Sequence, residues 1–229
     1  MLHPPIAFAH RGARAHAPEN TLDAFGLARR LGATGLESDV WLTRDGIPVL
    51  RHDGRIRVGR RTRRIADVDR VDLPPSVPSL AELYDACGDE SELSLDIKDP
   101  AALAPVLDVA GAAGGHAVER LWLCAETPED AIAWRETAHG AHVVCSTRRR
   151  AIGHGAERLA ARLAEAGVDA VNLHASDWSG GLTTLFHRFE RLCFGWDAQY
   201  ERVILALRRM GIDGVYSDHV DRLVATLFD

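Results

Sequence analysis

Lysine is nearly absent from this sequence: Lys98 is the only lysine among 27 basic residues, and the rest are arginine. Lysine carries a compact charge on a flexible stem, whereas arginine carries a rigid, planar fork. The single lysine stands in the run LSLDIKDP, two residues after Asp96. We therefore expect Lys98 to have a role tied to one particular site.

Signals that direct a chain into or across a membrane are also missing. No run of about 20 apolar residues occurs, so we expect no membrane span. The start, MLHPPIAFAHRG, has neither a basic region nor a long apolar region, so no signal peptide is expected. The four cysteines lack C-x-x-C spacing, and three lie in apolar runs typical of buried free thiols. A reducing, cytoplasmic location is therefore expected.

Two classes of ligand are disfavoured. The net charge of −6 is unfavourable for a general nucleic-acid binder, so no nucleic-acid partner is expected. No G-x-G-x-x-G sequence follows the first apolar run, which disfavours dinucleotide binding. Apolar residues still make up 46% of the chain, enough to form a large core.

Short apolar runs typical of strands alternate with segments of helical spacing. The strand-like runs cover residues 6–10, 35–43, 92–98, 120–126, 142–147, 170–176, 191–197 and 214–218. Successive strand–helix units favour a parallel sheet, because parallel neighbours need helical crossovers. At this length we expect one α/β domain over residues 1–229, an eight-stranded parallel βα (TIM) barrel.

One interval interrupts this alternation. Residues 54–78 lack a helical pattern and hold six arginines between Arg55 and Arg64. We expect a short arginine-rich insertion here. Two interpretations stay open: a solvated basic loop, or a lid that attracts an anionic substrate to the barrel mouth.

The stretch 37–53, ESDVWLTRDGIPVLRHD, gathers acids and a histidine. Its DG dipeptide is suited to a two-residue hairpin turn, which would place Asp39 opposite His52. Opposed residues lie about 5 Å apart at Cβ, and strand alternation puts Glu37 on the same face. The spacing therefore predicts two carboxylates and an imidazole at one spot.

Barrel enzymes build their active sites at the carboxyl ends of the strands. The polar or aromatic residues at those predicted ends are His10, Arg11, Glu37, Asp39, His52, Asp96, Lys98, Glu126, Ser146, His174, Trp196 and Asp218. His174 and its neighbour Asn172 are expected to fill the barrel interior. Asp218 is as well suited to cap the last helix as to touch substrate. Glu126 and Ser146 stay without an assigned role.

Three carboxylates of this set, Glu37, Asp39 and Asp96, offer hard oxygen ligands without a cysteine. Such a set favours Mg²⁺ or Ca²⁺ over Zn²⁺. His10 and His52 reach the same place from different segments and are suited to acid–base catalysis near neutral pH.

Arg11 and Lys98 supply positive charge for a phosphate group, and Trp196 is expected to form a wall of the substrate pocket. Metal, cations and imidazoles together describe cleavage of a phosphate ester. Structural roles are also open: His10 as a capping histidine, the acids as an ion network with arginines, and Asp96–Lys98 as a plain salt bridge.

Four segments resemble motifs of the glycerophosphodiester phosphodiesterase family. HRGARAHAPENTLDAF (10–25) resembles its opening motif, and the stretch 37–53 resembles its second. VPSLAEL (77–83) and GIDGVYSDHVDRL (211–223) resemble later motifs. The resemblance extends over nearly the whole chain. It implies a βα barrel that hydrolyses glycerophosphodiesters to glycerol 3-phosphate and an alcohol with a divalent cation.

The resemblance also implies roles by matched position. His10 and His52 would be the acid–base pair, Arg11 would bind phosphate, and Glu37 and Asp39 would bind the metal.

Further positions follow from the same motifs. Trp196 would line the glycerol pocket, and Glu19 and Asn20 would tie down the first loop. The sequence departs from the family where Asp96 replaces the usual glutamate before Lys98. Because aspartate is one methylene shorter, we expect the metal to shift or to gain a bridging water.

The leading hypothesis is a metal-dependent phosphodiesterase that acts on small soluble glycerophosphodiesters by His/His acid–base catalysis. One alternative is a lysophospholipase D-like enzyme whose arginine-rich interval contacts lipid. Another is a barrel that binds phosphate esters without catalysis, which the Asp96 substitution suggests. Nucleic-acid binding through Arg55–Arg64 fits the acidic chain least well.

Overall fold

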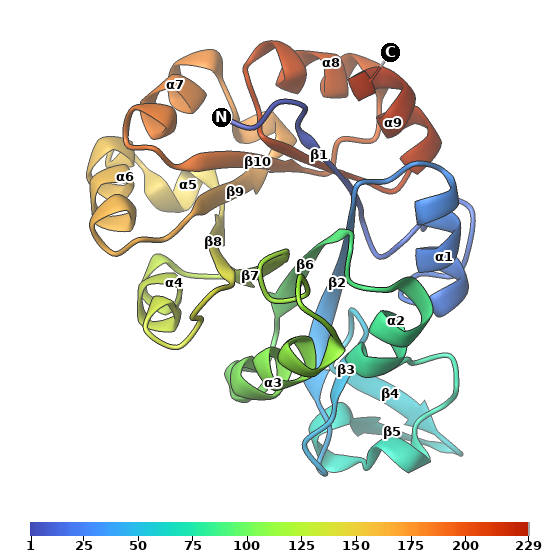
Figure 1. Ribbon diagram of the computed structural model, residues 1–229. Helices are drawn as coiled ribbons and strands as arrows, with labels where there is room; N and C mark the ends of the chain where they lie inside the picture. Colours follow the sequence, from blue (N-terminus) through green and yellow to red (C-terminus); the bar gives the residue numbers. More distant parts are fainter. Residues whose placement is uncertain (229) are drawn as a thin grey trace.

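In the computed structural model, which describes residues 1–228, eight parallel strands close into a barrel with helices outside (Figure 1). The barrel strands are β1 (Ile6–Ala9), β2 (Gly35–Leu42), β6 (Glu92–Ile97), β7 (Leu121–Ala125), β8 (His142–Thr147), β9 (Ala170–His174), β10 (Leu192–Trp196) and β11 (Gly214–Ser217). Strand β1 pairs with both β2 and β11, which closes the ring. The predicted barrel is confirmed.

Helices follow the strands and cover the outside of the ring. They are α1 (Leu22–Arg30), α2 (Leu80–Cys87), α3 (Leu103–Ala113), α4 (Pro128–Arg135), α5 (Arg149–Ile152), α6 (Ala156–Glu165), α7 (Gly180–Arg188), α8 (Glu201–Arg209) and α9 (Val220–Phe228). Short 3₁₀ turns are η1 (Ile65–Asp67), η2 (Arg70–Asp72), η3 (Pro100–Ala102) and η4 (Ala175–Asp177). Thr21, Ser79, Thr127 and Ser179 each accept a backbone N–H at a helix start, the role expected of these residue types.

Large side chains fill the barrel interior. Phe8 stacks on Tyr216 with ring centroids 4.5 Å apart, and Phe194 meets Phe8 edge-on at 5.6 Å. Gly35 makes room for this cluster, because a Cβ there would lie 2.5 Å from the Phe8 ring. A filled interior leaves only the rim of the barrel for a binding site.

The hairpin after β2 differs from the predicted register. Strand β3 (Pro48–Leu50) pairs antiparallel with β2 through a three-residue loop, 44–46, in which Gly46 has φ +79°. Arg51, not His52, lies opposite Asp39, and its N–H donates to the Asp39 carbonyl at 2.9 Å. The prediction of a two-residue turn was wrong. Here the turn is followed by a glycine in the left-handed conformation, and this type of hairpin loop contains three residues instead of two.

The arginine-rich interval is a hairpin rather than a loop. Strands β4 (Arg55–Val58) and β5 (Arg61–Arg64) form a separate two-stranded sheet beside β3 (Figure 1). Ile56 is buried against Val49 and Ile65, whereas the arginines of β5 are exposed. A small apolar cluster therefore gives this insertion regular structure.

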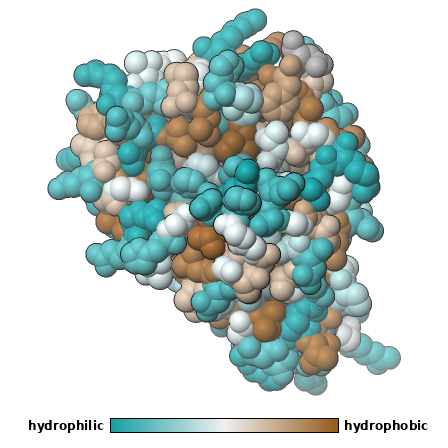
Figure 2. Space-filling view, viewed as in Figure 1, coloured by the Kyte–Doolittle hydropathy of each residue, from teal (hydrophilic) through white to brown (hydrophobic). Residues whose placement is uncertain are grey.

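Surface and thiols agree with the composition. On the face seen in Figure 2, hydrophobic side chains form separate patches divided by hydrophilic ones. Every helix within residues 1–228 is too short or too polar to cross a bilayer. The four cysteines all lie in this range, and each is buried and free, as expected.

Candidate active site

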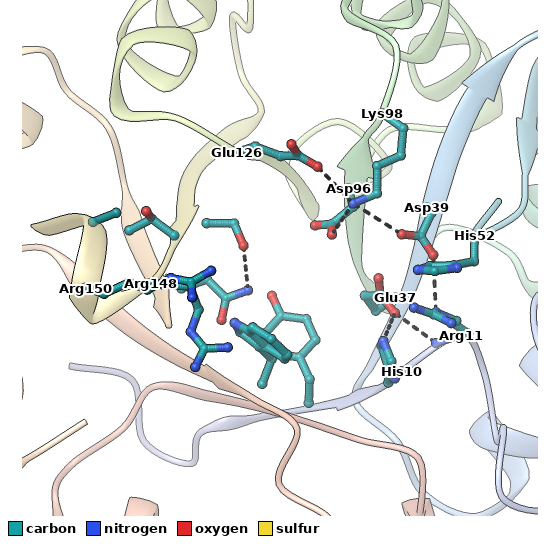
Figure 3. Close-up of a pocket in the computed structure, with 16 residues that line it drawn as sticks. His10, Arg11, Glu37, Asp39, His52, Asp96, Lys98, Glu126, Arg148 and Arg150 are labelled. Carbon is teal, nitrogen blue, oxygen red and sulfur yellow. Dashed lines mark hydrogen bonds and ion pairs between the residues drawn. The ribbon is translucent and has the colours of Figure 1, made fainter. Parts of the chain in front are cut away.

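One pocket of about 470 Å³ opens at the carboxyl ends of the barrel strands (Figure 3). The structure brings all eight predicted site residues into its lining: His10, Arg11, Glu37, Asp39, His52, Asp96, Lys98 and Trp196. The remaining lining residues are Glu126, Ser146, Thr147, Arg148, Arg150, Ala151, Asn172 and Tyr216.

Three carboxylates meet on one side of the pocket. Asp39 on β2 and Asp96 on β6 are register partners, and Glu37 lies two residues before Asp39. One oxygen from each of the three acids lies within 4.8 Å of the others. Parallel pairing of two strands thus brings together acids that are far apart in the chain.

The acidic cluster is short of positive charge. Glu37 is 4% exposed and Asp39 is 2% exposed. Burial raises the pKa of Glu37 to about 8, and burial together with Asp96 raises the pKa of Asp39. The buried Asp39 Oδ2 has no hydrogen-bond partner among residues 1–228. These three carboxylates are hard oxygen donors, the ligand type that Mg²⁺ and Ca²⁺ prefer, so they fit a divalent cation.

His10 ends β1 and lies between two carboxylates. Its Nδ1 hydrogen-bonds to Asp218 Oδ1 at 2.6 Å, and its Nε2 lies 3.8 Å from Glu37 Oε2. Burial alone would lower the pKa of His10, but the charge of Glu37 and the hydrogen bond that His10 makes to Asp218 raise it overall. Asp218 therefore orients the imidazole, with Nε2 directed toward the acids. Sequence reasoning left Asp218 between a helix cap and a substrate contact.

His52 lies at the more open edge of the same pocket. It follows the end of β3, so strand alternation no longer governs where its side chain points. Its Nδ1 lies 2.9 Å from Asp53 Oδ1, and its side chain is 45% exposed. The one-residue error in register therefore did not remove His52 from the site.

Arg11 is held by carboxylates through both its backbone and its side chain. Its N–H donates to Glu37 Oε2 at 2.9 Å. Its Nε lies 3.3 Å from Asp39 Oδ2, and its Nη1 donates to Glu19 Oε2 at 3.2 Å. The guanidinium is thus fixed beside the acidic cluster.

The turn after β1 depends on two left-handed residues. Arg11 has φ +53° and Gly12 has φ +75°. A Cβ on Gly12 would lie 2.7 Å from the backbone carbon of Ala24, so only glycine fits there. Asn20 accepts a hydrogen bond from Ser38 Oγ at 2.7 Å and donates its N–H to the Arg11 carbonyl at 3.0 Å. Asn20 thus ties the first loop to β2.

Lys98 bridges three carboxylates rather than one. Its Nζ lies 3.2 Å from Asp96 Oδ2, 3.5 Å from Asp39 Oδ1 and 3.2 Å from Glu126 Oε1. Burial alone would lower the pKa of Lys98, but these acids raise it above its ordinary value. Lys98 therefore stays charged at the edge of the acidic cluster.

The opposite wall contains residues that sequence reasoning missed or set aside. Arg148 lies over the Trp196 ring, with its guanidinium carbon 5.2 Å from the ring centroid. Arg148 and Arg150 belong to the run RRR (148–150) that follows β8. A search for polar residues extended three positions beyond the end of that strand would have found them. Asn172, expected to fill the interior, lines the pocket, and its Oδ1 has no partner in the described chain. His174 lies outside the lining and hydrogen-bonds to Asp197.

Comparison with known proteins agrees with the family resemblance of the segments 10–25 and 37–53. Residues 10–78 match the model of the "Glycerophosphoryl diester phosphodiesterase family". "Glycerophosphodiester phosphodiesterase 1" of Homo sapiens is 51% identical over 63 residues, 27% of this chain and 19% of the human protein. "Probable glycerophosphodiester phosphodiesterase 2" of Mycobacterium tuberculosis is 34% identical over 122 residues, 48% of this chain and 45% of that protein.

The first third of the chain thus matches the glycerophosphodiester phosphodiesterase family, and the chain is similar to curated proteins that carry this name. It spans less than half the length of the two curated relatives named above. Among solved structures, a glycerophosphodiester phosphodiesterase from Thermotoga maritima has a TM-score of 0.83 at 23% identity, covering 98% of this chain and 99% of that one. An Oleispira antarctica phosphodiesterase, solved with the product sn-glycerol-3-phosphate, has a TM-score of 0.83 at 21% identity, covering 98% and 97%. These likenesses confirm the family's barrel fold.

Proposed function

We propose that this chain, as one phosphodiesterase barrel over residues 1–229 with its insertion at 54–78, hydrolyses glycerophosphodiesters to glycerol 3-phosphate and an alcohol. The observation that carries the proposal is one pocket in which His10 and His52 stand with the cluster of three carboxylates and with the cations Arg11 and Lys98. The names of the family's relatives support the same reaction. A reducing, cytoplasmic location is part of the proposal, because buried free thiols are typical of such a compartment.

Glu37, Asp39 and Asp96 would hold the divalent cation, Mg²⁺ or Ca²⁺. When bound, such a cation polarises a phosphoryl oxygen and offsets the charge of the acids. The raised pKa of Glu37 supports this assignment, and so does Asp39 Oδ2, which is buried and accepts no hydrogen bond although Arg11 lies 3.3 Å away.

Arg11 and Lys98 flank the acids and are suited to bind the oxygens of the phosphodiester. Each is already positioned by carboxylates, so little side-chain freedom would be lost on binding. Trp196 gives the substrate an apolar wall on the other side of the pocket.

The two histidines divide the proton transfers. Asp218 accepts a hydrogen bond from His10 Nδ1, so Nε2 is available to accept the proton of the attacking hydroxyl. Attack by water gives glycerol 3-phosphate directly, whereas attack by the adjacent glycerol hydroxyl gives a cyclic phosphate that a water molecule then opens. As the bond from phosphorus to the leaving oxygen breaks, His52 donates a proton to that oxygen. The exposure of His52 suits contact with an alcohol that leaves toward solvent.

The test replaces each histidine separately with alanine and follows glycerol 3-phosphate release from glycerophosphocholine with Mg²⁺ or Ca²⁺. Loss of a general acid or base should lower kcat about 10²- to 10⁴-fold. His139→Ala, at an exposed position outside the pocket, is the matched control and should keep the parent rate. Near-parent rates for His10→Ala and His52→Ala would refute the proposal.

The same assay separates the alternatives. A lysophospholipase D-like enzyme would release its head group from a long-chain lysophospholipid and ignore glycerophosphocholine. A phosphate-ester binder would bind the diester without turnover under either cation.

A further inference from the structure

Lys98 already meets as many carboxylates as its ammonium group has hydrogen atoms. Its Nζ lies 3.2 Å from Asp96 Oδ2, 3.2 Å from Glu126 Oε1 and 3.5 Å from Asp39 Oδ1 (Figure 3). A protonated lysine has three hydrogen-bond donors and no acceptor. A phosphate oxygen can therefore take a donor from Lys98 only if one of these carboxylates moves away.

Two of the three carboxylates are fixed by the barrel. Asp39 and Asp96 are register partners on β2 and β6, and both belong to the proposed cation site. The side chain of Asp39 is 3% exposed and that of Asp96 is 30% exposed. Movement of either carboxylate away from Lys98 would disturb the proposed cation ligands.

Glu126 is the carboxylate that is free to move. It directly follows the last residue of β7, and its side chain is 70% exposed. Lys98 is the only hydrogen-bond or ion-pair partner of its side chain within residues 1–228. An exposed ion pair of this kind stabilises little, so a bound anion can replace it at small cost.

A displaced Glu126 side chain has space beside the pocket. Glu126 also lines a second cavity of about 380 Å³, together with Arg158 and Arg162. Arg162 is paired with Glu129 at 3.2 Å, whereas Arg158 has no carboxylate within 4.0 Å in the described chain. The carboxylate of Glu126 can therefore turn toward positive charge when a phosphate group takes its place on Lys98.

We propose that Glu126 is a displaceable anion that occupies the phosphate-binding position on Lys98 until substrate binds, and that its return favours release of the product. The inference rests on the proposed function, because it takes Lys98 as a ligand of the phosphate group. Glycerol 3-phosphate carries more negative charge than the diester, so repulsion from Glu126 should weaken product binding more than substrate binding. Glu126 thus sets the affinity of the site without touching the reacting atoms.

The experiment replaces Glu126 with glutamine, which keeps the size of the side chain and removes its charge. The substrate is glycerophosphoglycerol, whose two alcohols are uncharged, with a saturating divalent cation. Glu126→Gln should lower KM about three- to tenfold. The dissociation constant of glycerol 3-phosphate, measured by calorimetry, should fall by a larger factor. Added salt should reduce both differences from the parent, because Glu126 is exposed.

Glu119→Gln is the matched control. It removes a carboxylate of similar exposure, 72%, just before the other end of β7 and outside the pocket. This variant should keep the parent KM and the parent affinity for glycerol 3-phosphate. An equal fall in KM for Glu119→Gln would show a general effect of net charge and would refute the inference.

The sign of the change in Glu126→Gln separates the inference from its alternatives. An unchanged KM would mean that Glu126 is a solvated rim residue, and a higher KM would mean that it positions Lys98 for the substrate. Either result would overturn the inference and leave the proposed reaction intact.

Binding of glycerol 3-phosphate tests Glu126 without turnover. If the parent chain does not hydrolyse the diester, the proposed function fails, but the calorimetry still compares the parent with Glu126→Gln. Tighter binding in the variant supports the inference, and equal or weaker binding refutes it.

Discussion

Asp218 and His10 are 208 residues apart in the chain, yet Asp218 Oδ1 lies 2.6 Å from His10 Nδ1. The contact exists because β11 pairs with β1 where the barrel closes. His10 ends one of these strands, and Asp218 follows the other. Closure of the fold therefore sets the orientation of one of the two proposed proton carriers.

Asp218→Asn should lower kcat about 10- to 100-fold, the range typical of a lost partner behind a functional histidine. The substrate would still meet Arg11 and Lys98, so KM should change little. Steady-state kinetics with Mg²⁺ separates the two constants. Asp221→Asn removes a carboxylate from another Asp–His pair, His16–Asp221 at 3.0 Å, outside the pocket. That variant should keep the parent kcat, and an equal loss in both variants would contradict a positioning role for Asp218.

The barrel could be predicted from the sequence because its signal is local. Each barrel strand is a short apolar run that precedes a helix, and several of these helices begin at a recognisable cap residue. Parallel strands place their carboxyl ends on one rim. Glu37, Asp39 and Asp96 followed directly from that rule.

Other features depended on contacts or turn geometry that spacing does not reveal. The partner of His10 requires barrel closure, and the register opposite Asp39 depends on whether the turn has two or three residues. Arg148 and Arg150 stand in an arginine run with the composition of a solvated turn. Only the chain path after β8 turns them toward the pocket.

Asp96→Asn should weaken binding of Mg²⁺ or Ca²⁺ at least about tenfold, because it removes the charge of one of the three proposed oxygen ligands. Asp96→Glu, which extends the carboxylate by one methylene, should retain binding. Titration calorimetry of the protein without substrate gives the affinity directly. Asp108→Asn on the exposed side of α3 is the charge-matched control. Equal cation affinity in the parent and Asp96→Asn would remove Asp96 from the ligand set.

Asp169 lies directly before β9, at the end of the barrel away from the pocket, and its carboxylate makes the free energy of unfolding depend on pH. Its Oδ2 accepts the Val143 N–H at 2.8 Å and Arg135 Nη1 at 3.0 Å. Burial alone would raise the pKa of Asp169, but bonds from His142 and Val143 lower it overall. The pKa of Asp169 is therefore lower in the folded state than in the unfolded state. Its carboxylate stabilises the folded protein at pH values above the unfolded-state pKa, and this stabilisation is lost as the pH falls through the folded-state pKa.

Asp169→Asn should therefore lower the free energy of unfolding by about 1 to 3 kcal/mol near neutral pH. The difference from the parent should shrink below about pH 4, where the carboxylate becomes protonated. Urea unfolding across this pH range measures both quantities. A constant difference at all pH values would show that the lost contacts, not the charge, account for the effect.

Alanine substitutions at Gly12 and Gly46 separate two losses of stability. One is the steric clash of an added Cβ with nearby backbone, and the other is the strain of a non-glycine residue at positive φ. Gly12 has φ +75° and Gly46 has φ +79°. An added Cβ at Gly46 meets no atom within 4 Å, whereas at Gly12 it would lie 2.7 Å from the Ala24 backbone. Gly46→Ala should cost about 1 kcal/mol for its backbone alone, and Gly12→Ala about 1 to 3 kcal/mol more through overpacking.

The steric clash in Gly12→Ala should also disturb the active site. Arg11 directly precedes Gly12 and donates its N–H to Glu37, so a shift of this backbone would move both residues. We expect Gly12→Ala to raise KM for the diester and Gly46→Ala to leave it unchanged. Urea unfolding and steady-state kinetics on both variants measure the two effects. Similar losses of stability in the two variants would mean that the α1 backbone moves aside easily, and the turn would then not depend on glycine for space.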